Sequence, residues 1–160
     1  MQTPLRWAIV ETPVMTARAM QLGGNYFHAF TSITDAATAL GSVDLIHASG
    51  SIPYVPDPLS TLEVLAALQP RYIMLARFPI WRETPVVAIQ RSLLSRNGIG
   101  QMPPDVKDRE ISYPITLINI NDVLQTLNRY EIVLMMDSQN SNYIFSGRSI
   151  PIASIYFRAR

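Results

Sequence analysis

The sequence of 160 residues predicts one α/β domain, and three observations carry that prediction. Short, continuously apolar runs alternate with segments whose apolar residues recur every three or four positions. Proline and glycine stand between these segments, where they start and stop helices. Two strand candidates follow one another at the C-terminal end with only a turn-rich segment between them. The alternation predicts a mainly parallel sheet with helices on both faces, and the ending predicts an antiparallel strand pair.

The N-terminal half reads as alternating strands and helices. Thr12 is a candidate N-cap before Pro13, and Gly23-Gly24 is a helix stop. The predicted elements are a strand at Trp7–Val10, a helix at Pro13–Leu22, a strand at Tyr26–Ser32, a short helix at Thr34–Leu40 and a strand at Val43–Ser49.

The next helix is predicted to begin at Asp57-Pro58, with Ser60 and Glu63 as an alternative capping box one turn later. The elements predicted after it are a strand at Arg71–Ile80, a helix at Glu83–Leu94, a loop or insertion at Ser95–Pro114, a helix at Asn121–Arg129, and strands at Tyr130–Ser138 and Ile150–Arg160. The whole order predicts a Rossmann-like sheet, in which ligands bind at the carboxyl ends of the strands.

Composition narrows the class of protein. The formal net charge is +1, which argues against a nucleic-acid or membrane-surface partner. The chain has no cysteine, so disulfides, thiolate metal sites and cysteine nucleophiles are excluded. No apolar run approaches the length of a membrane span, and the N-terminus lacks the apolar core of a signal peptide, so a cytoplasmic location is expected. No metal-binding cluster, catalytic triad or Walker-type loop is found.

Four segments carry a resemblance to a known family. They are "LRWAIVETP", "VDLIHASGSIPYVPDP", "RYIMLARFPI" and "SYPITLININDVLQTLNRYEIVLMMDS". In this order and spacing they resemble the class I S-adenosylmethionine-dependent methyltransferase fold, and one bacterial family of methyltransferases in particular. The resemblance covers nearly all of the chain. It implies S-adenosylmethionine as cofactor and methyl transfer to an unidentified small-molecule acceptor.

The sequence departs from that fold in one respect. Methyltransferases of this type carry a Gly-rich loop after their first strand, and no such loop precedes Trp7. The resemblance implies that the missing strand–helix unit lies at the sheet centre, between Trp7–Val10 and Val43–Ser49. The chain is therefore expected to be an N-terminally incomplete domain: a truncated product, a half completed by another chain, or a degenerate domain.

The resemblance also assigns a cofactor site. Glu11 matches the acid that binds the ribose hydroxyls, and its alternative role is a charge at a helix N-terminus. Ser32 and Ile33 match the adenine region, with ordinary strand-end packing as the alternative. Ser49 and Gly50 match the loop beneath the methionine part of the cofactor, with a simple turn as the alternative.

The acceptor site is predicted less directly. Tyr54, Arg77, Gln90 and Tyr113 are candidates to line it, and Arg77 is suited to an anionic group. The alternatives are a packed aromatic side chain for Tyr54 and a surface ion pair for Arg77. His47 is interpreted as a core histidine, although it stays a candidate base. No catalytic residue is assigned.

Two hypotheses from different classes follow. The first is a methyltransferase. Because the Gly-rich cofactor loop is missing, whether this chain is active by itself is left open. The second is a non-catalytic domain that keeps part of the fold for binding or assembly, as a homo-oligomer or with a complementing chain. An unrelated flavodoxin-like domain is a weaker alternative, because the antiparallel ending counts against it.

Overall fold

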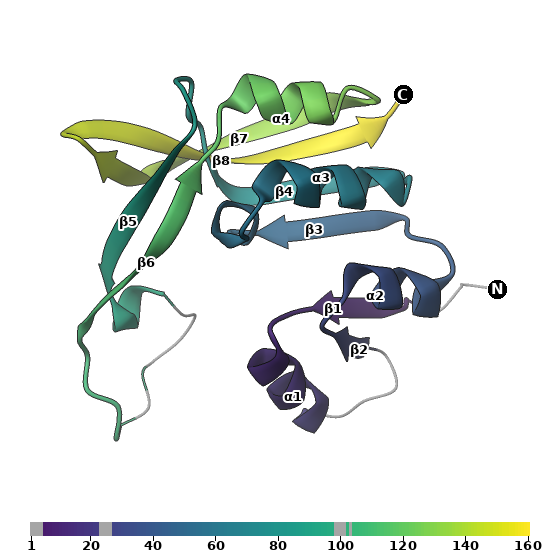
Figure 1. Cartoon of the computed structure of the whole chain (residues 1–160), viewed down its shortest axis with the longest axis horizontal. Helices are drawn as coiled ribbons and strands as arrows, with labels where there is room; N and C mark the ends of the chain where they lie inside the picture. The colour runs from purple at the N-terminus through teal and green to yellow at the C-terminus, as the bar shows by residue number, and fades with distance from the viewer. Residues whose placement is uncertain (1–4, 23–26, 98–101, 103) are drawn as a thin grey trace.

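Helices and strands alternate along the N-terminal half of the chain, and strands dominate the C-terminal half (Figure 1). The computed structural model describes residues 5–22, 27–97, 102 and 104–160. In chain order the elements are β1 (Trp7–Val10), α1 (Pro13–Gln21), β2 (Phe27–Phe30), α2 (Ile33–Leu40), β3 (Leu45–Ser49), η1 (Ile52–Tyr54), α3 (Pro58–Ala67), β4 (Tyr72–Pro79), β5 (Val86–Leu93), η2 (Leu94–Arg96), β6 (Glu110–Leu117), α4 (Ile120–Thr126), β7 (Tyr130–Phe145) and β8 (Arg148–Ala159). None of the described helices is long and apolar enough to span a bilayer.

The described strands form three hydrogen-bonded groups. β1 pairs with β2 and β3 with β4, both in parallel, whereas β4 and β7 each flank β8 in antiparallel pairs. The central group has the order β3-β4-β8-β7, and β5 and β6 form a separate antiparallel hairpin. The α/β class and the antiparallel C-terminal pair are confirmed. The mainly parallel sheet is found only in part, because parallel and antiparallel pairs are mixed within one sheet.

The helix starts follow the predicted chemistry in part. Both α1 and α3 carry proline in their first turn. Asp57 caps α3, because its carboxylate accepts hydrogen bonds from the Ser60 backbone N–H at 3.1 Å and from the Ser60 hydroxyl at 2.9 Å. The alternative capping box of Ser60 and Glu63 is therefore wrong. Thr12 precedes α1, but its side chain makes no capping bond. The predicted stop at Gly23-Gly24 lies outside the described residues.

The main core lies between the central sheet and the helices α3 and α4. Leu62 of α3, Val123 of α4, Ile73 and Leu75 of β4, and Phe157 of β8 are each at most 1% exposed. Burying a large apolar side chain contributes about 1.5–3 kcal/mol, so these contacts hold the sheet and both helices together. The carboxyl end of β3 is fixed by this core through Ala48, which is buried in the same cluster.

Residues 86–93 form the strand β5, where a helix was predicted for residues 83–94. β5 pairs with β6 from Val86 opposite Leu117 to Leu93 opposite Glu110. Along β5 partly buried and exposed side chains alternate, which is the period of a half-buried strand. The loop predicted for residues 95–114 is also wrong in its last part, which belongs to β6. Residues 98–101 and 103 of that segment lie outside the described residues.

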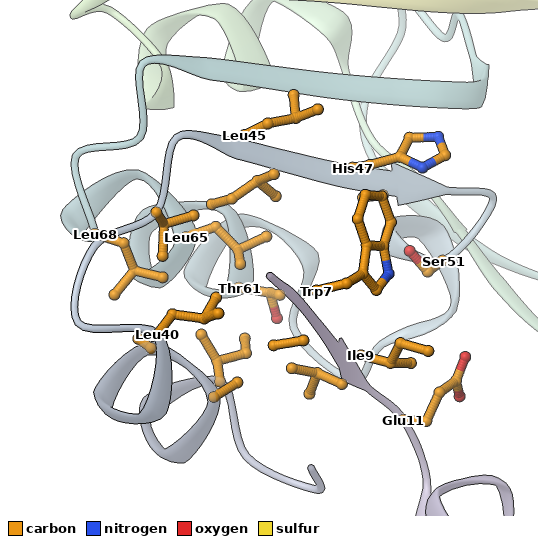
Figure 2. Close-up of a pocket in the computed structure, with 18 of the residues that line it drawn as sticks. Trp7, Ile9, Glu11, Leu40, Leu45, His47, Ser51, Thr61, Leu65 and Leu68 are labelled. Atoms are coloured by element: carbon orange, nitrogen blue, oxygen red, sulfur yellow. The ribbon is translucent and has the colours of Figure 1, made fainter. Parts of the chain in front are cut away.

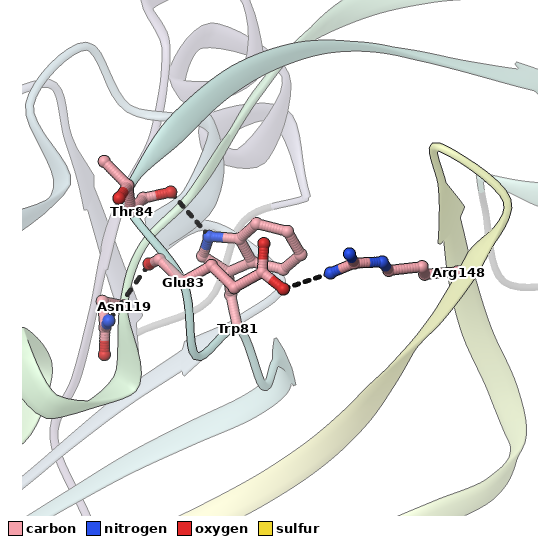
Figure 3. A network of polar contacts seen from close by, with 5 residues as sticks. All are labelled: Trp81, Glu83, Thr84, Asn119 and Arg148. Carbon is pink, nitrogen blue, oxygen red and sulfur yellow. Dashed lines mark hydrogen bonds and ion pairs between the residues drawn. The ribbon is translucent and has the colours of Figure 1, made fainter.

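Three polar contacts hold the start of the β5–β6 hairpin, one of them local and two to distant parts of the chain (Figure 3). The indole N–H of Trp81 donates to the Thr84 carbonyl at 2.9 Å, and Trp81 is only 7% exposed. The side-chain amide of Asn119 donates to the Glu83 carbonyl at 3.0 Å, and Arg148 forms an ion pair with the Glu83 carboxylate. These contacts set the direction in which the hairpin leaves the central sheet.

Candidate functional site

A groove separates β1 from β3 (Figure 2). Its cavity has a volume of about 450 Å³, and its walls come from β1, β3, α2, α3 and the turn after β3. The arrows of β1 and β3 point the same way in Figure 1, so their carboxyl ends lie at the same end of the groove. Glu11 and Ser49 mark this end. Open α/β sheets bind ligands beyond the carboxyl ends of their strands.

Glu11 directly follows β1 and lines the groove. Its backbone N–H donates to the Phe30 carbonyl at 2.9 Å, which ties the strand end to β2. Its exposed carboxylate accepts a hydrogen bond from the Thr12 N–H at 3.3 Å, just before α1 begins. The position fits the predicted acid at a strand tip, and the contact with Thr12 also fits the alternative of a charge at a helix start.

The two residues predicted for the adenine region differ in their surroundings. The Ser32 hydroxyl accepts a hydrogen bond from the Asp35 N–H at 3.3 Å and caps α2. Ile33 begins α2 and lines the groove. Its apolar side chain is therefore available to a ligand in the groove, whereas the Ser32 hydroxyl already has a structural role as an N-cap.

Ser49 and Gly50 form a tight turn under the side chain of Arg77. Gly50 has a φ of 59°, a conformation that favours glycine. A Cβ at Gly50 would lie 3.0 Å from Nη2 of Arg77. The guanidinium donates from Nε to the Ser49 hydroxyl and from Nη2 to the Ser49 carbonyl, each at 3.2 Å. The predicted role of Gly50 was to let a cofactor approach the backbone closely. In the structure the Arg77 guanidinium makes that close approach.

Arg77 itself interrupts β4. Its φ is 52°, and the pairing of β4 with β8 shifts register between Leu75 and Phe78. A side chain other than glycine rarely adopts this backbone conformation, and such strained positions cluster at functional sites. The ion pairs among the described residues do not include Arg77, so the alternative of a surface ion pair is not supported.

A larger cavity, of about 1210 Å³, lies between the β5–β6 hairpin and the turn after β3. All four predicted acceptor residues, Tyr54, Arg77, Gln90 and Tyr113, line it. They come from four different elements, and the fold brings them to one place. Gly50 lines this cavity as well, so the two cavities adjoin at the Ser49-Gly50 turn.

A chain of neutral hydrogen bonds crosses this cavity. The Tyr54 hydroxyl lies 3.0 Å from the Tyr143 hydroxyl and donates to Oε1 of Gln90 at 2.7 Å. Nε2 of Gln90 donates to the Tyr113 hydroxyl at 3.1 Å, which donates to Oδ1 of Asn97 at 2.7 Å. The network fixes the orientation of each amide and hydroxyl, and it joins the turn after β3 to both strands of the hairpin.

Tyr54 is the most perturbed group of this network. Burial raises the pKa of its hydroxyl well above the ordinary value of 10.0, and the neighbouring Tyr143 hydroxyl raises it further. Tyr54 is therefore protonated at neutral pH. It can hold a polar ligand group by hydrogen bonding, but it cannot serve as a base there.

Sequence reasoning missed Tyr143, Asn97 and Ser92, which all line the larger cavity. Tyr143 lies 89 residues from its partner Tyr54, and no local pattern indicates such a contact. His47 was predicted as a core residue, but its side chain is exposed and lines the groove. Successive side chains of a strand point to opposite faces, and the two residues that flank His47, Ile46 and Ala48, take the core face of β3. Among the described residues, no cluster of potential ligands could hold a metal ion.

Comparison with known proteins gives a fold. No family model and no characterised protein matched the sequence. The N-terminal domain of EvdMO1, solved with SAH bound, matches with a TM-score of 0.55 and 14% identity over 96% of this chain and 64% of that one. The glycopeptide N-methyltransferase MtfA matches with a TM-score of 0.53 and 14% identity, over 96% of this chain and 72% of that one. An S-adenosylmethionine-dependent methyltransferase from Clostridium acetobutylicum matches with a TM-score of 0.52 and 9% identity, over 97% of this chain and 75% of that one.

The chain therefore has the class I methyltransferase fold, as the resemblance implies. Nearly all of the chain is covered in each match. The chain spans 64% of the length of the EvdMO1 domain, which is less than two thirds.

Proposed function

We propose that this chain is the greater part of a single methyltransferase domain, which uses S-adenosylmethionine to methylate a small-molecule acceptor. The observation that carries the proposal is the junction of two cavities at one turn: Ser49 lines the groove, and Gly50 lines the larger cavity. A group-transfer enzyme needs its donor and acceptor sites to adjoin. Structures of this fold with bound SAH, S-adenosylmethionine or sinefungin support the choice of cofactor.

The predicted cofactor residues fit this ligand in part. Glu11, Ile33 and Ser49 line the groove, and the exposed Glu11 carboxylate can accept hydrogen bonds from two ribose hydroxyls. The Ser32 hydroxyl fits less well because it caps α2. Gly50 fits less well because the guanidinium of Arg77 covers it. We therefore assign the cofactor to Glu11, Ile33 and Ser49 first.

The chain's own residues contribute position rather than acid–base chemistry. Bound S-adenosylmethionine supplies an activated methyl group, so the protein has to align the acceptor with it. Tyr54, Gln90 and Tyr113 offer neutral donors and acceptors to a polar group of the acceptor. The cavity lining includes Arg77 and Arg96 and no carboxylate among the described residues. This charge pattern favours a neutral or anionic acceptor over a cation.

Calorimetric titration of the folded chain with S-adenosylhomocysteine tests the cofactor site. Glu11→Ala should weaken binding by about 1–3 kcal/mol, because a charged hydrogen-bond acceptor is lost. Glu63→Ala is the matched control, since Glu63 is exposed on α3 and does not line the groove. Absence of heat from folded protein would refute autonomous cofactor binding. Equal affinity of both variants would remove Glu11 from the site.

A second function is a non-catalytic domain that serves binding or assembly. The specific observation in its favour is the open edge that β1 and β3 each present to the groove, where the described residues place no strand. The calorimetric experiment separates the two functions. A folded chain that binds a partner but neither S-adenosylhomocysteine nor an acceptor would support the second.

A further inference from the structure

The three arginines that line the larger cavity differ in their neighbours. Arg91 forms an ion pair with Glu110 at 3.9 Å. The pKa of the Asp108 carboxyl is lowered, first by a hydrogen bond from a backbone N–H, and the positive charge of Arg96 contributes to the lowering. Arg77, in contrast, takes part in none of the ion pairs among the described residues. Its charge is therefore available to a group that enters the cavity.

The backbone on both sides of this contact is shaped to hold the guanidinium over the turn after β3. Arg77 has a φ of 52° at the point where the pairing of β4 with β8 shifts register, and Gly50 has a φ of 59°. A Cβ at Gly50 would lie 3.0 Å from Nη2 of Arg77 and 3.3 Å from both Cζ and Nε. The guanidinium therefore rests on a glycine, and a side chain at that position would crowd it.

Ser49 orients the guanidinium and leaves one of its edges available. Nε donates to the Ser49 hydroxyl and Nη2 to the Ser49 carbonyl, each at 3.2 Å. A guanidinium has five N–H donors, so three remain, two on Nη1 and one on Nη2. Because Nε and Nη2 both bond to Ser49, that residue lies at the side of the planar group. The remaining donors of Nη1 and Nη2 include a parallel pair at its end, which matches two oxygens of a carboxylate or a phosphate.

The other walls of the cavity indicate the body of the ligand. Leu117 and Ile152 line it, and the rings of Tyr54 and Tyr113 meet edge to face with their centroids 5.5 Å apart. Ligand sites of this kind combine apolar walls with a few polar groups that fix orientation. A cation held at one place among apolar and aromatic walls suits an amphipathic anion, with the charged group at one end and an apolar or aromatic body behind it.

The cofactor also carries a carboxylate, on its methionine part, and it is the rival occupant of this guanidinium. Arg77 lines the larger cavity, and it is not among the residues that line the groove. The side chain that faces the groove at this turn is that of Ser49. The placement of Arg77 favours a ligand of the larger cavity over the cofactor.

We propose that Arg77 binds a carboxylate or phosphate group of the methyl acceptor, so that the acceptor is an organic anion with an apolar or aromatic body. The ligand is called an acceptor on the strength of the proposed function, on which this inference rests. Its anionic group lies at the turn where the two cavities adjoin, and the atom that receives the methyl group lies close to that anionic group. A neutral acceptor would leave the oriented guanidinium without a partner.

Benzoate, phenyl phosphate and the neutral benzamide are probes that test this site without any cofactor. Each is titrated into the folded, isotopically labelled chain at constant ionic strength and followed by NMR. The better of the two anions should shift the signals of the Arg77 Nε–H and the Gly50 amide, and it should bind about tenfold more tightly than benzamide. Tighter binding of benzoate would identify the group as a carboxylate, and tighter binding of phenyl phosphate would identify it as a phosphate.

Variants of two cavity arginines provide the matched test in the protein. Arg77→Gln should weaken binding of the anion about tenfold and leave benzamide unchanged, whereas Arg77→Lys keeps the charge without the parallel donors and should lie between. Arg96→Gln removes a positive charge from the same cavity lining, and it should change the affinity less than about twofold. Slow exchange of the Ile73 amide verifies that each variant is folded. If Arg77→Gln does not fold, the comparison of the anions with benzamide in the wild type decides.

Three results would overturn the proposal. They are equal affinity of the wild type for the anions and benzamide, equal losses in Arg77→Gln and Arg96→Gln, and displacement of the bound anion by S-adenosylhomocysteine. The last result would assign Arg77 to the carboxylate of the cofactor and would leave the proposed function intact. Failure of S-adenosylhomocysteine to bind, with an anion bound at Arg77, would refute the proposed cofactor site and uphold the anion site.

Discussion

Tyr54 connects the turn after β3 to the β5–β6 hairpin through its bond to Gln90 at 2.7 Å. Tyr54→Phe removes this donor, and the unfolding free energy should fall by about 1 kcal/mol at neutral pH. The raised pKa of Tyr54 adds a pH dependence. The stability that it contributes is complete below the ordinary value of 10.0 and is lost as pH rises toward the higher value of the folded protein.

Urea unfolding between about pH 8 and 11 measures this effect. The stability of the wild type should decrease as pH rises through this range, and that of Tyr54→Phe should decrease less steeply. Identical slopes would mean that the Tyr54 hydroxyl titrates no differently in the folded chain than in the unfolded one.

At the residue scale, sequence reasoning succeeded where a position follows from the end of an element. Glu11 and Ser49 were placed at strand ends because their strands were predicted, and both line the groove. It failed where a side chain has a partner that only the tertiary structure supplies. The guanidinium over Gly50 comes from Arg77, and nothing within either local sequence indicates that contact.

The start of α3 rests on a single residue. The pKa of the Asp57 carboxyl is lowered, first by the bond from the Ser60 N–H and then by the bond from the Ser60 hydroxyl. Stability from this cap is therefore present above the ordinary value of 3.8 and is lost as pH falls through the lowered value. Asp57→Ala should lower the melting temperature at neutral pH. Asp57→Asn keeps an acceptor and should lower it much less.

Thermal unfolding followed by circular dichroism at about pH 7 and pH 3 compares the variants. The difference between wild type and Asp57→Asn should shrink at the acidic pH, which lies below the ordinary value of 3.8, because the unfolded chain then binds a proton that the folded cap resists. Ser60→Ala, which keeps the backbone bond and loses the hydroxyl bond, is the graded control. A melting temperature for Asp57→Ala equal to that of the wild type would contradict the assigned cap.

At the element scale, helices with clear caps were predicted well, and β5 was not. Val86 and Ala88 point toward a small core with Trp81, whereas Val87 and Ile89 are 67% and 64% exposed. The sequence does not show this alternation, because the exposed positions are apolar as well, but its β-branched residues are a strand signal. It was outweighed by the expected alternation of helices and strands, which the hairpin interrupts.

The whole molecule has an uneven core. Among the described residues, Ala36 is the one buried position between residues 5 and 40, whereas the main core gathers from β3 onward. β1 and β3 are not hydrogen-bonded to each other in the described part of the chain. The unit of β1, α1, β2 and α2 therefore has few contacts that require the central sheet to be folded, and it should open at a lower free energy.

Native-state hydrogen exchange in low concentrations of urea tests this difference. Amides of Ile9 and Phe30, which by register bond β1 to β2, should exchange through a smaller opening free energy than amides of Ile73 and Ile155 in the central sheet. Leu75→Ala should destabilise the central sheet by about 2–5 kcal/mol, because Leu75 is fully buried. The opening free energies of the two sets of amides should then lie closer together. Uniform exchange of both sets in the wild type would contradict this account, because it would mean that the N-terminal unit unfolds together with the central sheet.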